Sequence, residues 1–247
     1  MAVHLTEEFP MPNNPTVILV HGALSDASAW NVVNAKLQQE GHAVLAPAMP
    51  MRSLAEDISY LSSFLLTVDG PVVLVGHSYA GTVISAPTFA TEQVLGLIYV
   101  SAFAPDSGES SGELNGRWPG STLNESTIIM RASPCGQDLY LKPESFSSVY
   151  AHDLPESTVS LMASSQRPIN ASALGESFQG VPAWLTRPSW MLISTEDRSL
   201  PPAAQHFMAK RMGATVIEVS CSHAAPVSQP GAVSELIQKA VRATVHH

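Results

Sequence analysis

The chain has 247 residues, of which 45% are hydrophobic and only 13% are charged, and its formal net charge at pH 7 is −9. This length suits one domain of a larger α/β type, or one domain with a sizeable insertion. Nucleic acids and anionic membranes select proteins with clustered basic charge, and the chain has no run of Lys or Arg. We therefore expect neither as a partner.

The N-terminal stretch and the two cysteines indicate a cytoplasmic protein. MAVHLTEEFPMPNNP lacks the basic and long apolar regions of a secretory signal. No apolar run approaches the roughly 20 residues that a membrane helix needs. Cys135 and Cys221 stand apart, without a CxxC motif or a histidine at metal-ligand spacing, so we expect buried free thiols. The expectation is a soluble, cytoplasmic protein without a metal site.

Short apolar runs alternate along the chain with segments of helical spacing. The runs are continuous, as in strands that are buried on both faces of a sheet. They predict strands over 16–20, 43–47, 72–75, 95–100, 189–194 and 215–219. The intervening spacing predicts helices over 28–40, 53–67, 79–91, 201–212 and 231–243. This alternation is typical of a mostly parallel, doubly wound α/β sheet with helices on both faces.

The alternation fails once, in segment 104–188. This segment is rich in Ser, Pro and Gly and has no strand signal comparable to the others. A structureless loop of that length would be implausible in a compact domain. We expect an inserted, mainly helical cap over the carboxyl ends of the strands, where open α/β sheets bind ligands. Residues 1–103 and 189–247 would then form the core domain.

The stretch PVVLVGHSYAGTV leads a predicted strand directly into a serine. Ser78 has Gly76 before it and Ala80 and Gly81 after it, and helix-compatible residues follow. A strand, Gly-x-Ser-x-small-Gly and a helix form the context of a nucleophile elbow, a turn so tight that it needs small neighbours. The turn would raise the Ser78 hydroxyl above the sheet and aim the Tyr79 N–H at a reacting carbonyl oxygen. The alternative is an ordinary turn serine.

A serine nucleophile needs a base, which in this kind of sheet follows the last strand. His223 lies there, in the loop before the final predicted helix. His21 and His77 also follow strands, but the elbow geometry makes them structural groups that pack beneath the site.

The acid that orients the base is expected at the end of the penultimate strand. STEDRSLPP supplies Glu196 and Asp197 there, and Asp197 is the candidate because its loop leads into a proline. Asp106, after LIYVSAFAP, is the second choice. Asp197 could also act only as a favourable charge at the N-terminus of helix 201–212.

The loop after the first strand offers a second oxyanion donor. Gly22 allows a sharp backbone turn, and the Ala23 N–H would then point to the same place as the Tyr79 N–H. The alternative is a tight strand-to-helix turn without a catalytic role.

Over essentially its whole length the chain resembles the α/β-hydrolase superfamily, and within it small esterases related to plant methylesterases and bacterial pyrethroid-type hydrolases. The motifs that carry the resemblance are VHGA (20–23), GHSYAG (76–81), LIYVSAFAPD (97–106), STEDRSLPP (194–202) and SHAAPVSQP (222–230). The resemblance implies that Ser78 is the nucleophile, Asp197 the acid and His223 the base, with Ala23 and Tyr79 as the oxyanion hole. It also implies a sheet of about six to seven strands. Ala80, in place of a frequent glycine, is a mild departure.

The residue types favour ester hydrolysis over other chemistries of this superfamily. Ser78 is incompatible with the carboxylate nucleophile of dehalogenases and epoxide hydrolases. Resembling hydroxynitrile lyases carry Lys after the catalytic His and Thr after the first-loop His, where this chain has Ala224 and Gly22. We expect an acyl-enzyme mechanism on a small to medium, largely hydrophobic ester, with no metal or organic cofactor, in a monomer or homodimer. A lyase, a cofactor-free oxygenase or a receptor with a vestigial triad stay as alternatives.

Substrate choice is expected to depend on the cap. Its aromatic and apolar side chains would give a largely apolar lining, although side chains of this kind more often form a core. The candidates for substrate contact are Trp118, Tyr150, Met162 and Trp184. Tyr140 and Phe146 are expected to contribute to the same apolar lining. Arg167 is the candidate cation for an anionic substrate group, with a solvated surface arginine as the alternative.

Overall fold

The computed structural model describes residues 14–245, so the N-terminal stretch discussed above lies mostly outside the described residues. Six strands form one sheet, in the order β2-β1-β3-β4-β8-β9, and every neighbouring pair is parallel. Their bounds are β1 (Thr16–Val20), β2 (Val44–Leu45), β3 (Val72–His77), β4 (Val94–Val100), β8 (Ser189–Ser194) and β9 (Thr215–Val219). The predicted parallel α/β sheet is confirmed, with six strands.

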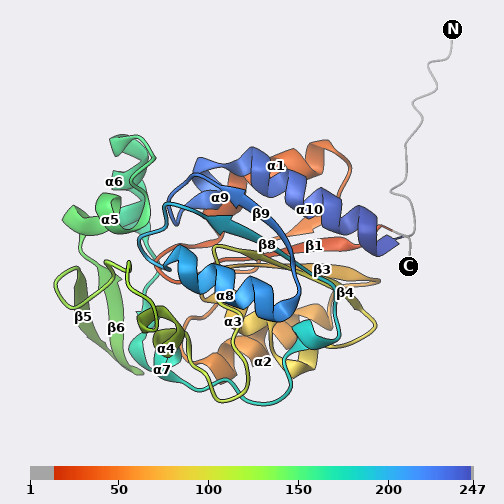
Figure 1. The fold of residues 1–247 in the computed structure, drawn as a ribbon, viewed down its shortest axis with the longest axis horizontal. Coiled ribbons are helices and arrows are strands. Elements are labelled where there is room, and N and C mark those ends of the chain that lie inside the picture. Colours follow the sequence, from red (N-terminus) through yellow and green to blue (C-terminus); the bar gives the residue numbers. More distant parts are fainter. Residues whose placement is uncertain (1–13, 246–247) are drawn as a thin grey trace, which may run out of the picture.

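Helices cover both faces of this sheet (Figure 1). On one face lie α1 (Asn31–Gln39) and α10 (Pro230–Val245). On the other face lie α2 (Leu54–Leu65), α3 (Ala80–Ile84) and α8 (Pro202–Met212). A short α9 (Ala225–Ser228) and 3-10 turns at Ala27–Trp30, Pro87–Phe89 and Ala183–Leu185 complete the core elements and their connections.

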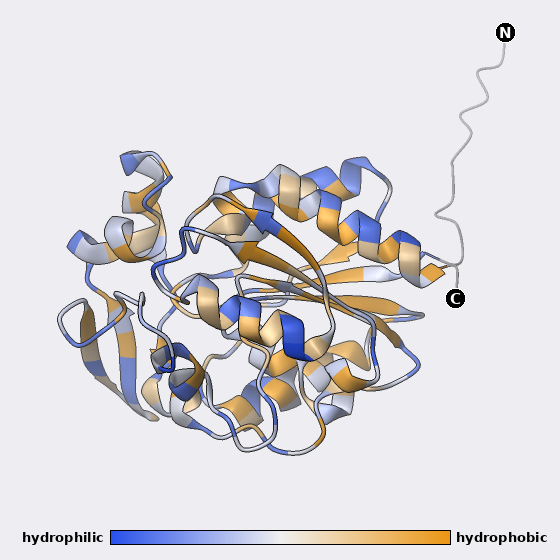
Figure 2. Ribbon diagram, viewed as in Figure 1, coloured by the Kyte–Doolittle hydropathy of each residue, from blue (hydrophilic) through white to orange (hydrophobic). Residues whose placement is uncertain are grey.

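The continuous apolar strands supply both layers of the core. Along β1, Val17 and Leu19 pack under α1 and α10, whereas Ile18 and Val20 pack on the opposite side. Side chains of a strand alternate between the two faces, so a strand between two helix layers must be apolar at every position. Figure 2 shows the result, with largely hydrophobic strands between helices that are hydrophobic on one side.

Two elements are shorter than their sequence patterns indicate. The helix predicted over 79–91 ends at Ile84, and Pro87 begins a separate 3-10 turn because proline cannot donate the next helical hydrogen bond. The strand predicted over 43–47 is reduced to two residues, since β2 is the edge strand and pairs only with β1. No helix in residues 14–245 is long and apolar enough to cross a membrane.

The segment between β4 and β8 lies beside one end of the sheet (Figure 1). It holds α4 (Ser111–Gly116), α5 (Pro143–Tyr150), α6 (Glu156–Ser165) and α7 (Ala171–Gly175), as expected of a helical insertion. It also holds an antiparallel sheet that the sequence analysis missed, formed by β5 (Ile128–Ser133), β6 (Gly136–Leu141) and β7 (Ile169–Asn170). None of the residues in IIMRAS is buried, so this strand does not show the pattern of one that packs between two helix layers.

The two cysteines are free thiols, but only one is buried. Cys221 lies in the core, whereas Cys135 is exposed in the turn between β5 and β6. The expectation that both are buried is therefore wrong for Cys135, because the small sheet of the insertion leaves its hairpin turn at the surface.

Candidate active site

Ser78 occupies a strained turn between β3 and α3. Its backbone φ is +54°, in the left-handed region that non-glycine residues rarely adopt. A Cβ atom on Gly81 would lie 2.2 Å from the Phe103 carbonyl oxygen, and one on Gly76 would lie 2.9 Å from the Ala80 carbonyl carbon. These contacts explain the small residues on both sides of the serine. Strained conformations of this kind concentrate at functional sites.

A chain of two hydrogen bonds joins Ser78, His223 and Asp197. The Ser78 Oγ lies 2.9 Å from His223 Nε2, and the Asp197 Oδ2 lies 2.6 Å from His223 Nδ1. Their exposed fractions are only 6%, 2% and 4%, so the chain is shielded from water. The three residues singled out in the sequence, which come from three separate loops, meet in space.

The Asp197 carboxylate is held by further donors. Its Oδ1 accepts the N–H groups of Ser199 and Leu200, both at 2.8 Å, and its Oδ2 accepts the Gln205 side-chain amide at 2.9 Å. Gln205 is fully buried on α8, and its Oε1 accepts the Ser194 N–H at 3.1 Å. Hydrogen bonds to a carboxylate stabilise its charge and fix its orientation. The sequence analysis missed Gln205, because nothing in its local pattern distinguishes it from other residues of α8.

The other acid candidates do not reach His223. The Asp106 carboxylate accepts the N–H of the next residue, Ser107, at 2.7 Å and so closes a local turn. Glu196 is exposed and hydrogen-bonds to the Ser220 hydroxyl.

His77 and His21 support the loops of the site. His77 Nε2–H donates to the His223 carbonyl at 2.9 Å, and burial together with the nearby His223 holds the pKa of His77 well below its usual value. His21 Nδ1–H donates to the Gly22 carbonyl at 2.9 Å, while its Nε2 accepts the Met49 N–H at 3.0 Å. Burial lowers the pKa of His21 as well. Both imidazoles are therefore neutral, and their hydrogen bonds connect separate backbone segments around the site.

The two N–H groups expected to form an oxyanion hole lie beside Ser78. Ala23 and Tyr79 line the same cavity as the serine. A Cβ atom on Gly22 would lie 2.7 Å from the Ser78 Cβ, so only glycine lets the first loop approach the elbow this closely. Within residues 14–245, neither the Ala23 N–H nor the Tyr79 N–H donates to a protein acceptor. Unpaired donors at this position are available to a developing oxyanion.

A cavity of about 60 Å³ opens at the Ser78 hydroxyl. Apolar side chains of the core and of the insertion dominate its lining, and these are Leu24, Phe103, Leu123, Leu139, Ile169, Leu174 and Leu200. Its polar lining consists of hydroxyl and amide groups and the His223 imidazole. None of the described residues that line it is an Asp, Glu, Lys or Arg.

A larger and more open hollow of about 450 Å³ lies next to this cavity. The two have five lining residues in common, here called the neck, which are Gly112, Asn115, Leu123, Leu139 and Leu174. The neck residues come from α4, α7 and β6 and from the chain just before β5. Any route from Ser78 to the outer hollow would have to pass between these residues.

Of the substrate contacts expected in the insertion, only Tyr150 lines the cavity. Trp118 lies at the outer hollow and packs against Phe207 with tilted rings, whose centroids are 4.9 Å apart. Trp184 is buried elsewhere, and its indole N–H donates to the Pro105 carbonyl at 3.1 Å.

The remaining side chains also lie outside the cavity. Met162 lines a separate hollow, and the Arg167 guanidinium is 3.4 Å from the Pro50 carbonyl. Phe146 packs against Tyr150 as core, and Tyr140 lies under Arg131. Aromatic side chains of the insertion were expected at the cavity, whereas leucine and isoleucine are the commonest apolar residues in its lining. Among the described residues, no group of three or more His, Cys, Asp or Glu is arranged to hold a metal ion.

Comparison with known proteins gives matches to hydrolases over nearly the whole chain. Residues 17–236 match the model of the alpha/beta hydrolase family. The alpha/beta hydrolase nvfD of Aspergillus novofumigatus is 30% identical over 252 residues, which cover 92% of this chain and 96% of that protein. Methylesterase 7 of Arabidopsis thaliana is 34% identical over 110 residues, covering 38% and 42% of the two chains. A pyrethroid hydrolase from Sphingobium faniae has a similar structure, with a TM-score of 0.75 at 22% identity over 94% of this chain and 99% of that one.

Proposed function

The chain belongs to the alpha/beta hydrolase family, and from that premise we propose that it is a serine hydrolase that cleaves carboxylic esters through an acyl-enzyme. One observation carries the proposal, namely the buried hydrogen-bond chain from Asp197 through His223 to Ser78 at the mouth of a cavity. A hydroxyl with a base at 2.9 Å, itself oriented by an acid, is the arrangement that activates a serine. Relatives that are named as esterases support the same reaction class.

In the first half of the reaction His223 acts as base and then as acid. Its Nε2 takes the Ser78 proton while the serine oxygen attacks the ester carbonyl. Asp197 holds the proton on Nδ1, so that Nε2 is free to accept, and stabilises the imidazolium that forms. When the tetrahedral intermediate collapses, the C–O bond to the alcohol breaks and His223 returns the proton to the leaving oxygen.

The oxyanion of the tetrahedral intermediate would be bound by the N–H groups of Ala23 and Tyr79. Fixed donors in a water-excluded site stabilise such charge without reorganising, and loss of one typically costs about 2.7–4 kcal/mol in the barrier. In the second half of the reaction, water takes the place of the alcohol. His223 takes a proton from the water while the water oxygen attacks the acyl carbon. The acyl–oxygen bond to Ser78 then breaks, His223 returns the proton to the Ser78 oxygen, and the free acid leaves.

The lining of the cavity supports a neutral, largely apolar ester as the substrate. A charged group would lose its hydration at a wall that offers it no counter-ion, which is costly. The small cavity at Ser78 suits the part of the substrate next to the ester bond. The open hollow beyond the neck gives room for a longer apolar arm.

Pre-steady-state turnover of p-nitrophenyl acetate and butyrate tests this proposal. We expect a burst of p-nitrophenol approaching one equivalent per chain, followed by slower steady turnover, and no burst with Ser78→Ala. Folded protein that turns over neither ester above the solvent rate would contradict the proposal. A lyase, a cofactor-free oxygenase or a receptor with a vestigial triad would then be the better description.

A further inference from the structure

Asp57 is a fully buried carboxylate that the mechanism above does not use. It lies on α2 with an exposed fraction of 0%. Its Oδ2 accepts the Tyr79 hydroxyl at 2.9 Å, and its Oδ1 accepts the Met51 N–H at 2.7 Å. Burying a carboxylate is costly even when it is hydrogen-bonded, and an apolar side chain would fill the same space without that cost. Its two hydrogen-bond partners, Tyr79 and Met51, show which backbone segments the carboxylate holds in place.

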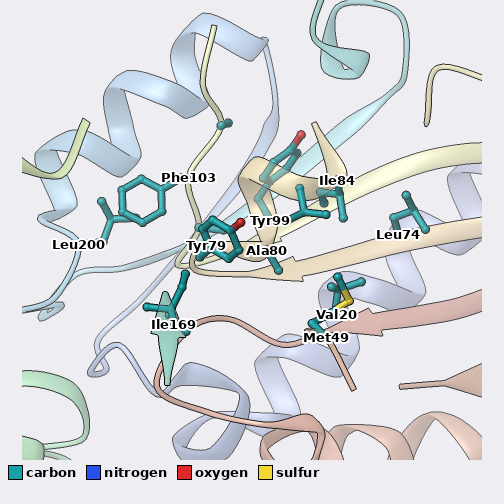
Figure 3. Close-up of a cluster of buried hydrophobic side chains, with 14 of the residues drawn as sticks. Val20, Met49, Leu74, Tyr79, Ala80, Ile84, Tyr99, Phe103, Ile169 and Leu200 are labelled. Atoms are coloured by element: carbon teal, nitrogen blue, oxygen red, sulfur yellow. The ribbon is translucent and has the colours of Figure 1, made fainter. Parts of the chain in front are cut away.

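The first partner, Tyr79, belongs to the turn that carries Ser78. Tyr79 follows Ser78, and its backbone N–H is one of the two oxyanion donors proposed above. Figure 3 shows Tyr79 and Ala80 where β3 passes into α3, with Phe103 and Ile169 nearby. The ring packs into this apolar cluster, and the Asp57 carboxylate is the hydrogen-bond acceptor of its hydroxyl. The bond ties the residue after the nucleophile to α2.

The second partner, Met51, is connected through neighbouring hydrogen bonds to the loop of Ala23, the other proposed oxyanion donor. Met51 has a left-handed backbone (φ +61°), which is unusual for its residue type, and the Asp57 carboxylate binds its N–H. Two residues earlier, the Met49 N–H donates to the His21 imidazole at 3.0 Å. His21 in turn binds the carbonyl of Gly22, the residue before Ala23.

The same backbone segment also holds the insertion over the site. The Met51 carbonyl accepts the Asn170 N–H of β7 at 2.9 Å. The residue before it, Ile169, lines the cavity at Ser78. A single carboxylate thus connects the elbow, the segment that supports the first loop, and one wall of the cavity.

From these contacts we propose that Asp57 and Tyr79 are positioning residues, which hold the N–H groups of Tyr79 and Ala23 at the separation that an oxyanion requires. The proposal rests on the esterase function argued above. Asp57 does not line the cavity at Ser78, and the Tyr79 hydroxyl is engaged by Asp57. Their effect is transmitted through the backbone of segments 79–81 and 49–51, so their loss should weaken transition-state binding and leave substrate binding largely unchanged.

Tyr79→Phe tests the proposal, with Tyr99→Phe as its matched control. Tyr99 is equally buried, and its hydroxyl also has one side-chain partner, the Ser85 Oγ at 2.9 Å. For Tyr79→Phe we expect kcat to fall about 10-fold and KM to change less than two-fold. Removal of an oxyanion donor typically lowers kcat 10²–10³-fold, and a misplaced donor should lose only part of that. A trifluoromethyl ketone, which forms a tetrahedral adduct with the serine, should bind more weakly by the same factor. Tyr99→Phe should leave both values within two-fold of wild type.

Amide hydrogen exchange provides a readout that needs no turnover. We expect the amides of segments 22–24 and 79–82 to exchange several-fold faster in Tyr79→Phe, and to be unchanged in Tyr99→Phe. Faster exchange at 79–82 alone, or equal effects of the two variants on kcat, would overturn the proposal. A wild-type protein that cleaves no ester would instead contradict the proposed function, and the exchange data would still decide whether the two loops are coupled through Asp57.

Asp57→Asn and the double variant with Tyr79→Phe complete the experiment. Asparagine keeps an acceptor for the Met51 N–H and nearly the same shape. If the two residues act as one unit, their effects on kcat should be non-additive, with the double variant close to the more impaired single variant. Additive effects would show that the pair does not act through this hydrogen bond and would contradict the proposal.

Discussion

The ring of Tyr150 stands edge-on against the imidazole of His223, with centroids 4.9 Å apart and planes at 81°. The Tyr150 backbone carbonyl also accepts the Ala224 N–H at 3.1 Å. Tyr150 ends α5 in the insertion, whereas His223 follows β9 of the core. The insertion therefore contacts His223, the proposed base, as well as lining the cavity, and this contact can be tested through the Tyr150 side chain.

We expect Tyr150→Ala to lower kcat about 10-fold, because the imidazole loses the ring that limits its rotation. The same change removes a fully buried aromatic side chain and should lower the free energy of unfolding by about 3–5 kcal/mol. Tyr150→Phe keeps the edge-on contact and should retain most of the activity. Steady-state kinetics and urea unfolding of both variants measure the two effects. Equal kcat values for the two variants would show that ring packing does not position His223.

Asp197→Asn should abolish most of the activity without unfolding the protein. The asparagine carbonyl can still accept the Ser199 and Leu200 N–H groups, but its NH₂ would face His223 Nδ1. The imidazole would then carry its proton on Nε2 and could not take one from Ser78. We expect kcat to fall roughly 10³–10⁴-fold, as for the corresponding change in serine proteases.

Asp106→Asn is the matched control for that variant, because Asp106 was the second choice for the acid. We expect its kcat to stay within two-fold of wild type, since its carboxylate closes a local turn at Ser107. A larger loss with Asp106→Asn than with Asp197→Asn would reverse the assignment of the acid.

Leu139→Trp tests whether a long substrate arm leaves the site through the neck. Leu139 lines both the cavity and the outer hollow, so a larger side chain should narrow the passage between them. We expect kcat/KM for p-nitrophenyl octanoate to fall at least about 10-fold more than kcat/KM for the acetate. Leu161→Trp, at an exposed position on α6, should change neither ratio. An equal loss for both esters would place the arm elsewhere.

The buried carboxylate of Asp57 should give the protein a characteristic pH dependence. Burial raises the pKa of Asp57 to about 6 from its usual value of 3.8, in spite of its hydrogen bonds to Tyr79 and Met51 and the charge of Arg52. Between these two values the folded state holds a proton that the unfolded chain has released. Stability therefore rises as the pH falls from 7 through 6 toward 4.

Asp57→Asn removes this titration, so the difference between the two proteins isolates it. We expect wild type to gain about 2 kcal/mol in unfolding free energy relative to Asp57→Asn between pH 7 and pH 4, because most of the effect of the raised pKa falls in this range. Urea unfolding of both proteins across this range gives the difference, in which other groups cancel. A difference that does not change with pH would show that Asp57 titrates normally.

The parts of the site that the sequence could predict are those fixed by local backbone geometry. Ser78 sits in a turn that demands small neighbours, and Asp197 and His223 follow strands whose carboxyl ends must meet at one edge of the sheet. Gln205 and Asp57 could not be predicted, since each acts through a partner that only the packing of distant segments brings near.

The insertion shows more clearly that local sequence patterns do not predict contacts between distant segments. Its lining depends on how α4, β6 and β7 dock on the core, through contacts such as Leu24 N–H to the Arg167 carbonyl and Asn170 N–H to the Met51 carbonyl. The hydrophobic periodicity of the sequence carries no information about these contacts. For that reason the aromatic residues chosen from composition proved mostly structural, and the small antiparallel sheet went unnoticed.

The most direct test of the proposed mechanism is the intact mass of the protein after incubation with a fluorophosphonate, for wild type and Ser78→Ala in parallel. An activated serine displaces fluoride and retains the phosphonyl group. We expect one adduct per chain on wild type and none on the folded Ser78→Ala variant. Wild-type protein that is folded but carries no adduct, or an adduct that persists in Ser78→Ala, would contradict Ser78 as the nucleophile.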